Sequence, residues 1–188
     1  MGAFEEKVAE LASLNVDLIH PEGAPPFMVL GYGGEHEIVK RWEEKHRIPI
    51  ITAGMTQIEA LRALGIRQFV GVTYFTGQIN DTFSRYFNEA GFKVLGMEGI
   101  AVPFENVGRL SAQEVYAHAK KVYLNHPEAE GMYMLGSGWR TLEIVDLLEQ
   151  DLGVPVVHPV PARVWAVQKR LKVRQPRAGY GRLLAEMP

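Results

Sequence analysis

The residues best suited to chemistry lie in the loops that follow short apolar runs. In the segment LGSGWRT, residues 135–141, Ser137 and Gly138 stand between an apolar run and a helical pattern. Backbone N–H groups and hydroxyls at the start of a helix bind anions, because the helix dipole leaves partial positive charge there. Tyr74 in a second such loop and His158 after the last apolar run could add a phenol and an imidazole. These loops therefore favour a small anion as ligand.

Each feature also has an ordinary structural interpretation. Gly136 and Gly138 can make a tight turn, the Tyr74 hydroxyl can bond a loop carbonyl, and a lone His158 can be a hydrogen-bonding loop residue. The LGSG segment lacks the spacing of a P-loop and of a nucleophile elbow, and no GxGxxG follows a predicted strand, so we expect no cofactor. The chain has no cysteine and no HxH or HExxH motif, which excludes thiol chemistry and predicts no metal site.

Short apolar runs alternate with amphipathic patterns, which predicts an α/β fold with a mainly parallel sheet. In such folds ligands bind beyond the carboxyl ends of the strands, where the loops named above converge. The predicted strands cover residues 16–19, 48–52, 68–73, 93–97, 131–135 and 154–157. The predicted helices cover residues 4–14, 35–46, 56–64, 78–90, 112–125, 140–152 and 162–171.

Composition restricts the class of protein and its partners. With 188 residues, 47% hydrophobic and 22% charged, the chain can bury a core and is not disordered. No apolar run approaches the roughly 18 residues of a membrane span, so we expect a cytoplasmic protein that does not bind membranes. Residues 163–182 hold seven Lys or Arg and no acid, but the net charge is -2. We interpret this basic stretch as a solvated face and expect no nucleic-acid binding.

Five segments together resemble a known family. They are similar to the aspartate/glutamate racemase superfamily, in its arylmalonate decarboxylase and maleate cis-trans isomerase branch. The segments are VDLIHPEG at 16–23, ALRALGIRQFVGVTY at 60–74, NDTFSRYFNEAGFKVL at 80–95, MLGSGWRTLEIVDLLEQDLGVPVVHPVPARVW at 134–165 and GYGRLL at 179–184.

The resemblance implies two pseudo-symmetric Rossmann-like lobes with parallel sheets and a ligand cleft between them. One lobe would comprise residues 1–66 with 158–188 and lack its first strand, and the other residues 67–157. Family members bind small carboxylic acids and form a carbanion beside a carboxylate, or add a thiolate across a double bond. An enediolate carries charge on two oxygens, so preorganised hydrogen-bond donors are needed to stabilise it.

The resemblance also suggests where the site residues lie. Gly23 falls where racemases have their first cysteine and the decarboxylase has glycine, and Ala24 and Pro25 fall where the decarboxylase has hydroxyl donors. Tyr74, or Phe75 in a neighbouring alignment, matches a carboxylate-binding tyrosine. The second cysteine position is matched by Ser137, or Gly136 in the neighbouring alignment, and Gly138 would supply a backbone donor.

The missing cysteines restrict the mechanism, because a serine hydroxyl ionises far less readily than a thiol. We expect an enzyme that binds a small mono- or dicarboxylic acid and acts as a cofactor-independent decarboxylase or isomerase through a carbanion. Ser137, Tyr74 and His158 would be its catalytic residues. The alternative is a catalytically inactive carboxylate-binding or regulatory homologue. A third option, a scaffold with a partner surface, rests only on the tryptophans, and association of identical chains stays open.

Overall fold

The computed structural model describes residues 1–136, 138–139 and 141–188. Helices and strands alternate along most of the chain, as the apolar pattern predicts, and the strands form one parallel sheet of order β2-β1-β3-β4. The helices are α1 (Gly2–Ala12), α2 (Ala24–Met28), α3 (Gly31–His46), α4 (Ala53–Ala63), α5 (Ile79–Glu89), α6 (Ala112–Leu124), α7 (Val145–Leu152), α8 (Pro159–Arg170) and α9 (Arg182–Glu186), with 3-10 turns η1 (Phe104–Arg109) and η2 (Leu142–Ile144). The strands are β1 (Gln68–Thr73), β2 (Lys93–Gly99), β3 (Met132–Met134) and β4 (Val156–Val157).

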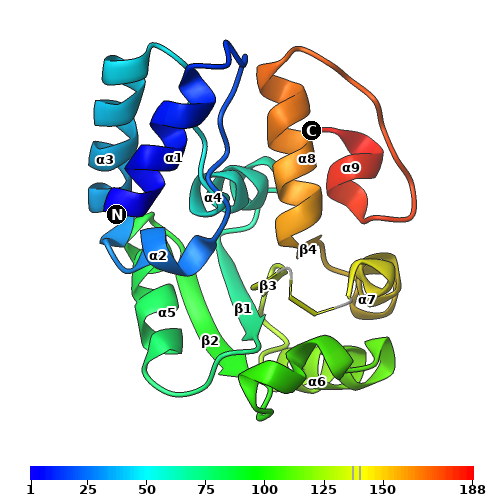
Figure 1. Ribbon diagram of the computed structural model, residues 1–188. Coiled ribbons are helices and arrows are strands. Elements are labelled where there is room, and N and C mark those ends of the chain that lie inside the picture. Colours follow the sequence, from blue (N-terminus) through cyan, green and yellow to red (C-terminus); the bar gives the residue numbers. More distant parts are fainter. Residues whose placement is uncertain (137, 140) are drawn as a thin grey trace.

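The sheet is covered on both faces, and the strands alternate accordingly. Phe69 of β1 and Tyr133 of β3 pack in one buried cluster with side chains of α4, α5 and α8. Val70 and Val72 of β1 pack in another cluster, with side chains of α6 and α7. Successive side chains of a strand point to opposite faces, so each apolar run supplies both cores. Figure 1 shows α5 beside β2 and α6 beneath the sheet.

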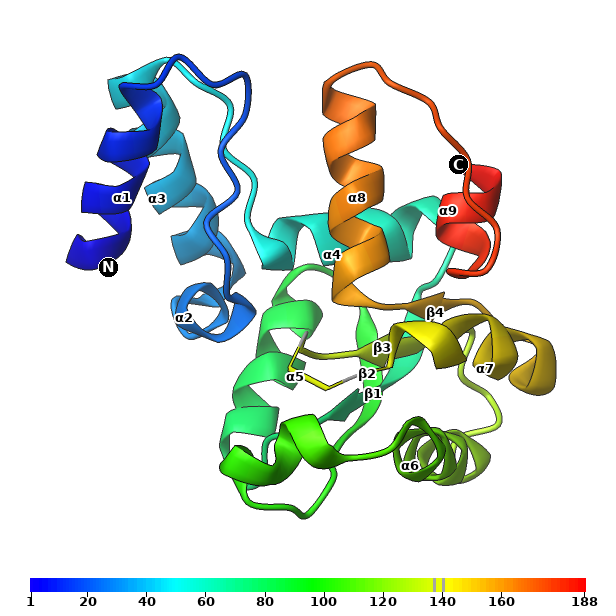
Figure 2. The same ribbon diagram turned by 45° about the vertical axis from the view of Figure 1, so that its right-hand side comes forward.

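In the first 66 residues the three predicted helices are present as α1, α3 and α4, but the two predicted strands do not form. The expected strands at 16–19 and 48–52 are represented only by an isolated parallel bridge between Ile19 and Ile50. Helices α1 and α3 pack over this bridge in a third buried cluster, which contains Trp42. A strand pair without further neighbours gains few ladder hydrogen bonds, so the extended segments do not develop into a sheet within the described residues. In Figures 1 and 2, α1, α2 and α3 form one group and α8 and α9 another, with α4 between them.

The termini of several helices follow local rules. The predicted capping box is present on α6, where the Ser111 side chain accepts from the N–H of Glu114 and the Glu114 carboxylate accepts from Ser111. Gly153 ends α7 in the left-handed conformation, as expected from its place after a helical run. No helix in the described part of the chain has both the length and the apolar character needed to span a bilayer.

Candidate functional site

A small cavity lies where the loops after β1 and β3 meet the first turns of α2, α4 and α8. Its volume is about 70 Å³. Pockets for drug-sized molecules run roughly 300–1,000 Å³, so this cavity suits a much smaller ligand. Residues from both predicted lobes line it: Glu22, Gly23, Ala24, Pro25, Ala53, Gln57 and Pro159 from the first, and Tyr74, Phe75, Leu135 and Gly136 from the second.

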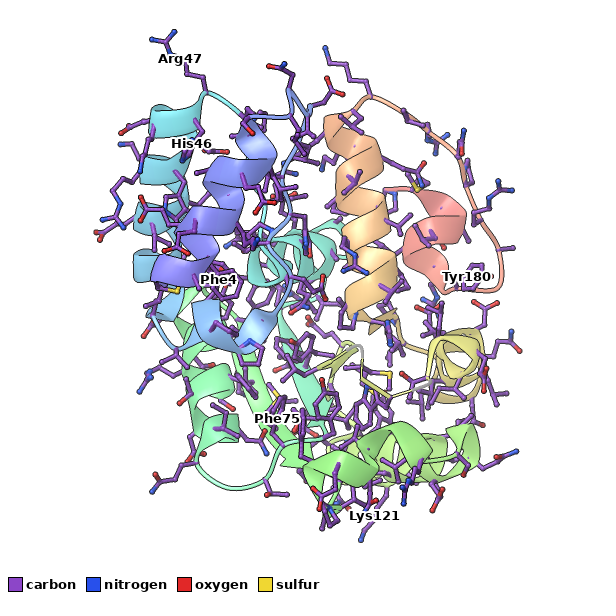
Figure 3. The ribbon with its side chains drawn as sticks, viewed as in Figure 1. Phe4, His46, Arg47, Phe75, Lys121 and Tyr180 are labelled. Carbon is purple, nitrogen blue, oxygen red and sulfur yellow. The ribbon has the colours of Figure 1, made fainter. Side chains whose placement is uncertain are left out.

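Five of the eight residues predicted to form the site line this cavity. Gly23, Ala24 and Pro25 lie at the start of α2, while Tyr74 and Gly136 follow β1 and β3. These segments are far apart in sequence, and the parallel sheet brings them together at the carboxyl ends of its strands. Phe75, the alternative to Tyr74, lines the cavity too and is half-buried; Figure 3 labels it. Ser137 lies outside the described residues, and Gly138 and His158 do not line the cavity.

The loop that carries Tyr74 and Phe75 is fixed by buried polar side chains. The Thr73 hydroxyl lies 2.9 Å from Oδ1 of Asn80 and accepts a hydrogen bond from the N–H of Phe75 at 3.1 Å. Nδ2 of Asn80 donates to the carbonyl of Phe75 at 2.9 Å. Thr73 is fully buried and Asn80 nearly so, and both have their hydrogen bonds satisfied. Their role is to hold the loop in place beside the cavity.

Tyr74 is held by neighbouring rings and by a glycine. Its ring makes an edge contact with Trp139 at 5.2 Å between centroids and lies 4.7 Å from the ring of Phe75. Gly136 has φ +103, and a Cβ added there would lie 2.0 Å from Cε1 of Tyr74, so only glycine fits. Burial raises the pKa of Tyr74, as does the charge of Glu22, while a backbone hydrogen bond from Gly138 lowers it. The phenol therefore stays protonated at neutral pH and can donate a hydrogen bond.

His158 has a structural environment. Its side chain caps α8, with Nδ1 accepting from the N–H of Val160 at 3.2 Å. The proton of the neutral ring is then on Nε2, which lies 2.9 Å from the hydroxyl of Thr141 and donates to it. Burial, with repulsion from Arg163, lowers the pKa of His158 to about 4. With both nitrogens engaged and no place in the cavity lining, His158 is not positioned to act on a ligand there.

Gln57 is a cavity residue that the sequence prediction did not single out. It lies on α4, one turn after Ala53, and its side chain is almost completely buried. Its Oε1 accepts from the Tyr133 hydroxyl at 2.7 Å, whereas no described residue accepts from its Nε2. The sequence did hold a signal for Gln57. It lies in the same helical stripe as Ala60 and Leu61, and such stripes usually hold apolar side chains, so a glutamine there is unusual.

The acidic residue at the cavity has a cationic partner. Glu22 forms an ion pair with Arg163 of α8 and lies 3.6 Å from Nδ1 of His20. The side chains of Glu22 and Arg163 are 54% and 34% exposed, so the pair lies in contact with solvent. Arg163 balances the negative charge, which reduces the repulsion that Glu22 would exert on an anionic ligand.

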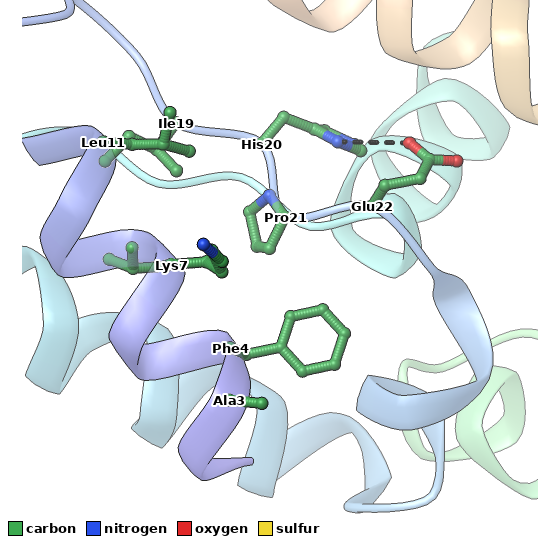
Figure 4. A pocket seen from close by; sticks show the side chains of 9 residues that line it. Ala3, Phe4, Lys7, Leu11, Ile19, His20, Pro21 and Glu22 are labelled. Carbon is green, nitrogen blue, oxygen red and sulfur yellow. Dashed lines mark ion pairs between the residues drawn. The ribbon is translucent and has the colours of Figure 1, made fainter.

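A larger hollow of about 290 Å³ lies against α1 (Figure 4). Phe4, Val8 and Leu11 give it a mainly apolar lining. Two of its polar residues have partners of their own, since Lys7 pairs with Glu10 at 2.6 Å and His20 approaches Glu22. It therefore offers apolar surface rather than a set of converging donors, and we place the functional site at the smaller cavity. In the described residues, no group of three or more acidic or histidine side chains could hold a metal ion.

Comparison with known proteins bears on both fold and site. A family model described as arylmalonate decarboxylase matches residues 9–184. An arylmalonate decarboxylase from Bordetella bronchiseptica is 28% identical over 145 residues, which cover 74% of this chain and 59% of that protein. The match thus spans less than two thirds of the length of this curated relative.

Two of the similar solved structures cover nearly the whole chain. A crystal structure of arylmalonate decarboxylase has a TM-score of 0.91 at 22% identity, covering 97% of this chain and 81% of that one. Maleate cis-trans isomerase from Nocardia farcinica, bound to TRIS, has a TM-score of 0.88 at 22% identity, covering 97% of this chain and 76% of that one. At this identity the structures confirm the predicted α/β, Rossmann-like fold class.

Proposed function

The chain belongs to the arylmalonate decarboxylase family, and on that premise we propose that it binds a small mono- or dicarboxylic acid in the cavity beside Tyr74 and Gly136. We further propose cofactor-independent decarboxylation or isomerisation through a carbanion. The observation that carries the proposal is the cavity itself, which is small and lined from the loops after β1 and β3 and the starts of three helices. In our division of the chain into residues 1–66 with 158–188, and 67–157, the ligand lies between the two lobes.

The residues have separate roles in this proposal. The protonated hydroxyl of Tyr74 donates to a carboxylate oxygen, and the hydroxyl of Ser137 supplies a further donor. The backbone of Gly138, which the sequence suggested as a donor to the ligand, instead bonds the Tyr74 oxygen and helps to hold the phenol. Gly23 lets the backbone approach the ligand, because its φ of +110 is a conformation that residues with a Cβ rarely adopt. Ala24 and Pro25 give apolar contact and no hydroxyl, so this chain has fewer donors at the start of α2 than the family pattern.

In decarboxylation, the bond between the α-carbon and the departing carboxylate breaks and CO2 leaves. The electron pair stays on the α-carbon and is shared with the remaining carboxyl group as an enediolate. Donors aimed at those oxygens stabilise the developing charge, and each is worth about 3 kcal/mol in a site that excludes water. A proton then reaches the α-carbon from a hydroxyl or from water, since the buried His158 ring does not line the cavity.

Ligand binding is tested by thermal unfolding with maleate, phenylmalonate and aspartate. A ligand that binds the native state raises Tm with concentration, by the equivalent of about 2.7 kcal/mol at one hundred times Kd. The neutral amides of the same acids are the matched controls, because they keep the shape and remove the charge. No shift with any of the three acids would contradict the proposed ligand class.

The alternative is a homologue that binds the acid without turning it over. The absence of cysteine and the buried, neutral His158 support this alternative. Proton NMR of each acid with the enzyme distinguishes the two, since decarboxylation or isomerisation gives new signals. Turnover that survives unchanged in Ser137→Ala would remove the catalytic role of Ser137. Binding without turnover in the wild type would favour the inactive homologue.

A further inference from the structure

The side-chain amide of Gln57 is a buried donor without a described acceptor, on a residue that lines the cavity. The residue is 1% exposed, lines the cavity and has no described acceptor for Nε2. Buried polar groups in folded proteins are almost always hydrogen-bonded, so an exception in a cavity wall calls for an explanation. A ligand with an oxygen acceptor would supply the missing partner.

The orientation of this amide is determined by Tyr133. The Tyr133 phenol is completely buried, and its pKa is raised well above the usual value by burial, so it keeps its proton and must donate. Its acceptor is Oε1 of Gln57 at 2.7 Å. Turning the amide over would put two donors face to face and leave the phenol without an acceptor. The NH2 group is therefore the part of Gln57 that has no described partner.

The surroundings of the amide favour an anionic acceptor. Ala53, which opens α4, lines the same cavity one turn before Gln57. α4 has 11 residues, and its first turn carries backbone N–H groups and the positive end of the helix dipole. Thr52 caps one of these groups by accepting from the N–H of Met55 at 3.2 Å. The described cavity residues nearest the start of α4 thus present donors rather than acceptors.

We infer that Gln57 is a carboxylate-binding residue of this chain, donating from Nε2 to an oxygen of the bound acid, with Tyr133 as the positioning residue that aims the amide. This inference rests on the proposed function. It adds a donor from α4 to those proposed after β1 and β3, in a chain whose α2 start offers Ala24 and Pro25 in place of hydroxyls. The acid would then be held from three elements of the fold.

The test measures Kd by calorimetry for whichever of maleate, phenylmalonate and aspartate binds the wild type. Gln57→Met keeps the length of the side chain and removes the amide, and we expect Kd to rise about tenfold or more, the usual effect of losing a hydrogen bond to a charged group. Gln57→Glu is the closest match in shape, yet its carboxylate repels the ligand, so we expect a still larger rise. If Gln57 had only a structural role, Gln57→Met would raise Kd more than Gln57→Glu. Gln113→Met, at an exposed position on α6, is the matched control and should leave Kd unchanged.

The positioning role of Tyr133 is tested by a separate measurement of Kd. Tyr133→Phe leaves the Gln57 amide in place and removes the donor that orients it, so we expect a rise in Kd smaller than that of Gln57→Met. Combined with Gln57→Met, Tyr133→Phe should add little, because the amide it orients is already gone. Full additivity of the two substitutions would refute the positioning role of Tyr133.

A measurement on the wild-type protein covers the case in which a variant does not fold. The side-chain NH2 signals of Gln57, assigned through their contacts with the Tyr133 ring, should shift as the acid is added and saturate at the calorimetric Kd. Binding of an acid with unchanged Gln57 signals, or with the same Kd in Gln57→Met, would refute the inference and leave the proposed function intact. Failure of the wild type to bind any of maleate, phenylmalonate and aspartate would refute both.

Discussion

The buried imidazole of His158 predicts a specific dependence of stability on pH. Its folded-state pKa is about 4, against 6.5 for an unperturbed histidine, because burial and Arg163 disfavour the charged ring. Below pH 6.5 the unfolded chain binds a proton that the native ring does not bind. The free energy of unfolding therefore falls as the pH decreases from about 6.5 to about 4, and it is unaffected by this group above pH 7.

The magnitude follows from the difference between the two pKa values. At 1.36 kcal/mol for each pH unit, a pKa lowered from 6.5 to about 4 corresponds to about 3 kcal/mol in total, of which about 2 kcal/mol is lost between pH 7 and pH 4.5. Other groups also titrate in this range. The contribution of His158 is therefore obtained as the difference between the wild type and a variant that cannot be protonated there.

His158→Asn is the suitable variant, since asparagine also caps helices but does not titrate. Urea unfolding at pH 7.5, 6.5, 5.5 and 4.5 should show that the wild type loses about 2 kcal/mol more than His158→Asn over this range. His36→Asn, at an exposed position on α3, is the control and should follow the wild type. Parallel pH profiles for the wild type and His158→Asn would refute the assignment of a buried, neutral ring.

Two further substitutions test the site and the packing of the C-terminal segment. Gly136→Ala places a Cβ 2.0 Å from Cε1 of Tyr74, so the ring must move, and acid binding should weaken at least tenfold by calorimetry. Gly77→Ala is the control, because Gly77 also has a positive φ but no atom lies within 4 Å of the added Cβ. It should cost about 1 kcal/mol of stability and leave Kd unchanged. Glu149→Ala removes a buried carboxylate that accepts from two backbone N–H groups at 2.8 and 2.7 Å. Urea unfolding should show a free energy of unfolding lower by about 2 to 4 kcal/mol. Glu37→Ala, at an exposed position, is the control and should change this free energy little. Unchanged binding in the first case, or equal stability in the second, would contradict these accounts.

The strands were predictable from sequence where other strands pair with them and helices cover both faces of the sheet. The run at 68–73 is a strand because its alternate side chains fill two cores, one under α5 and one under α6. The runs at 16–19 and 48–52 are also short and mainly apolar, but in the described residues they pair only with each other, and they form a single bridge. Local pattern indicates that a segment can be extended, whereas the number of neighbouring strands decides whether a sheet forms.

The site was predictable in its loops and less so in its side chains. Gly23, Tyr74 and Gly136 meet at one cavity because parallel strands end on the same edge. The burial of His158 could not be inferred from sequence, since it depends on Thr141 and on the packing at the start of α8. Gln57 was missed for a related reason, because only the folded chain shows that its amide has one described partner and that the residue lines the cavity.

Satisfaction of hydrogen bonds separates two kinds of buried polar residue near this cavity. Thr73 and Asn80 bond to each other and to the backbone of Phe75, so they fix the loop and leave no group for a ligand. Gln57 bonds through its oxygen alone, and its NH2 group stays available. Replacing Asn80 should therefore disturb the loop in the free protein and lower its stability. Replacing Gln57 also costs stability, because the buried Tyr133 phenol loses its acceptor, but it should in addition weaken acid binding. Asn80 and Gln57 are both buried, so the expected difference in their effect on acid binding follows from their hydrogen bonds.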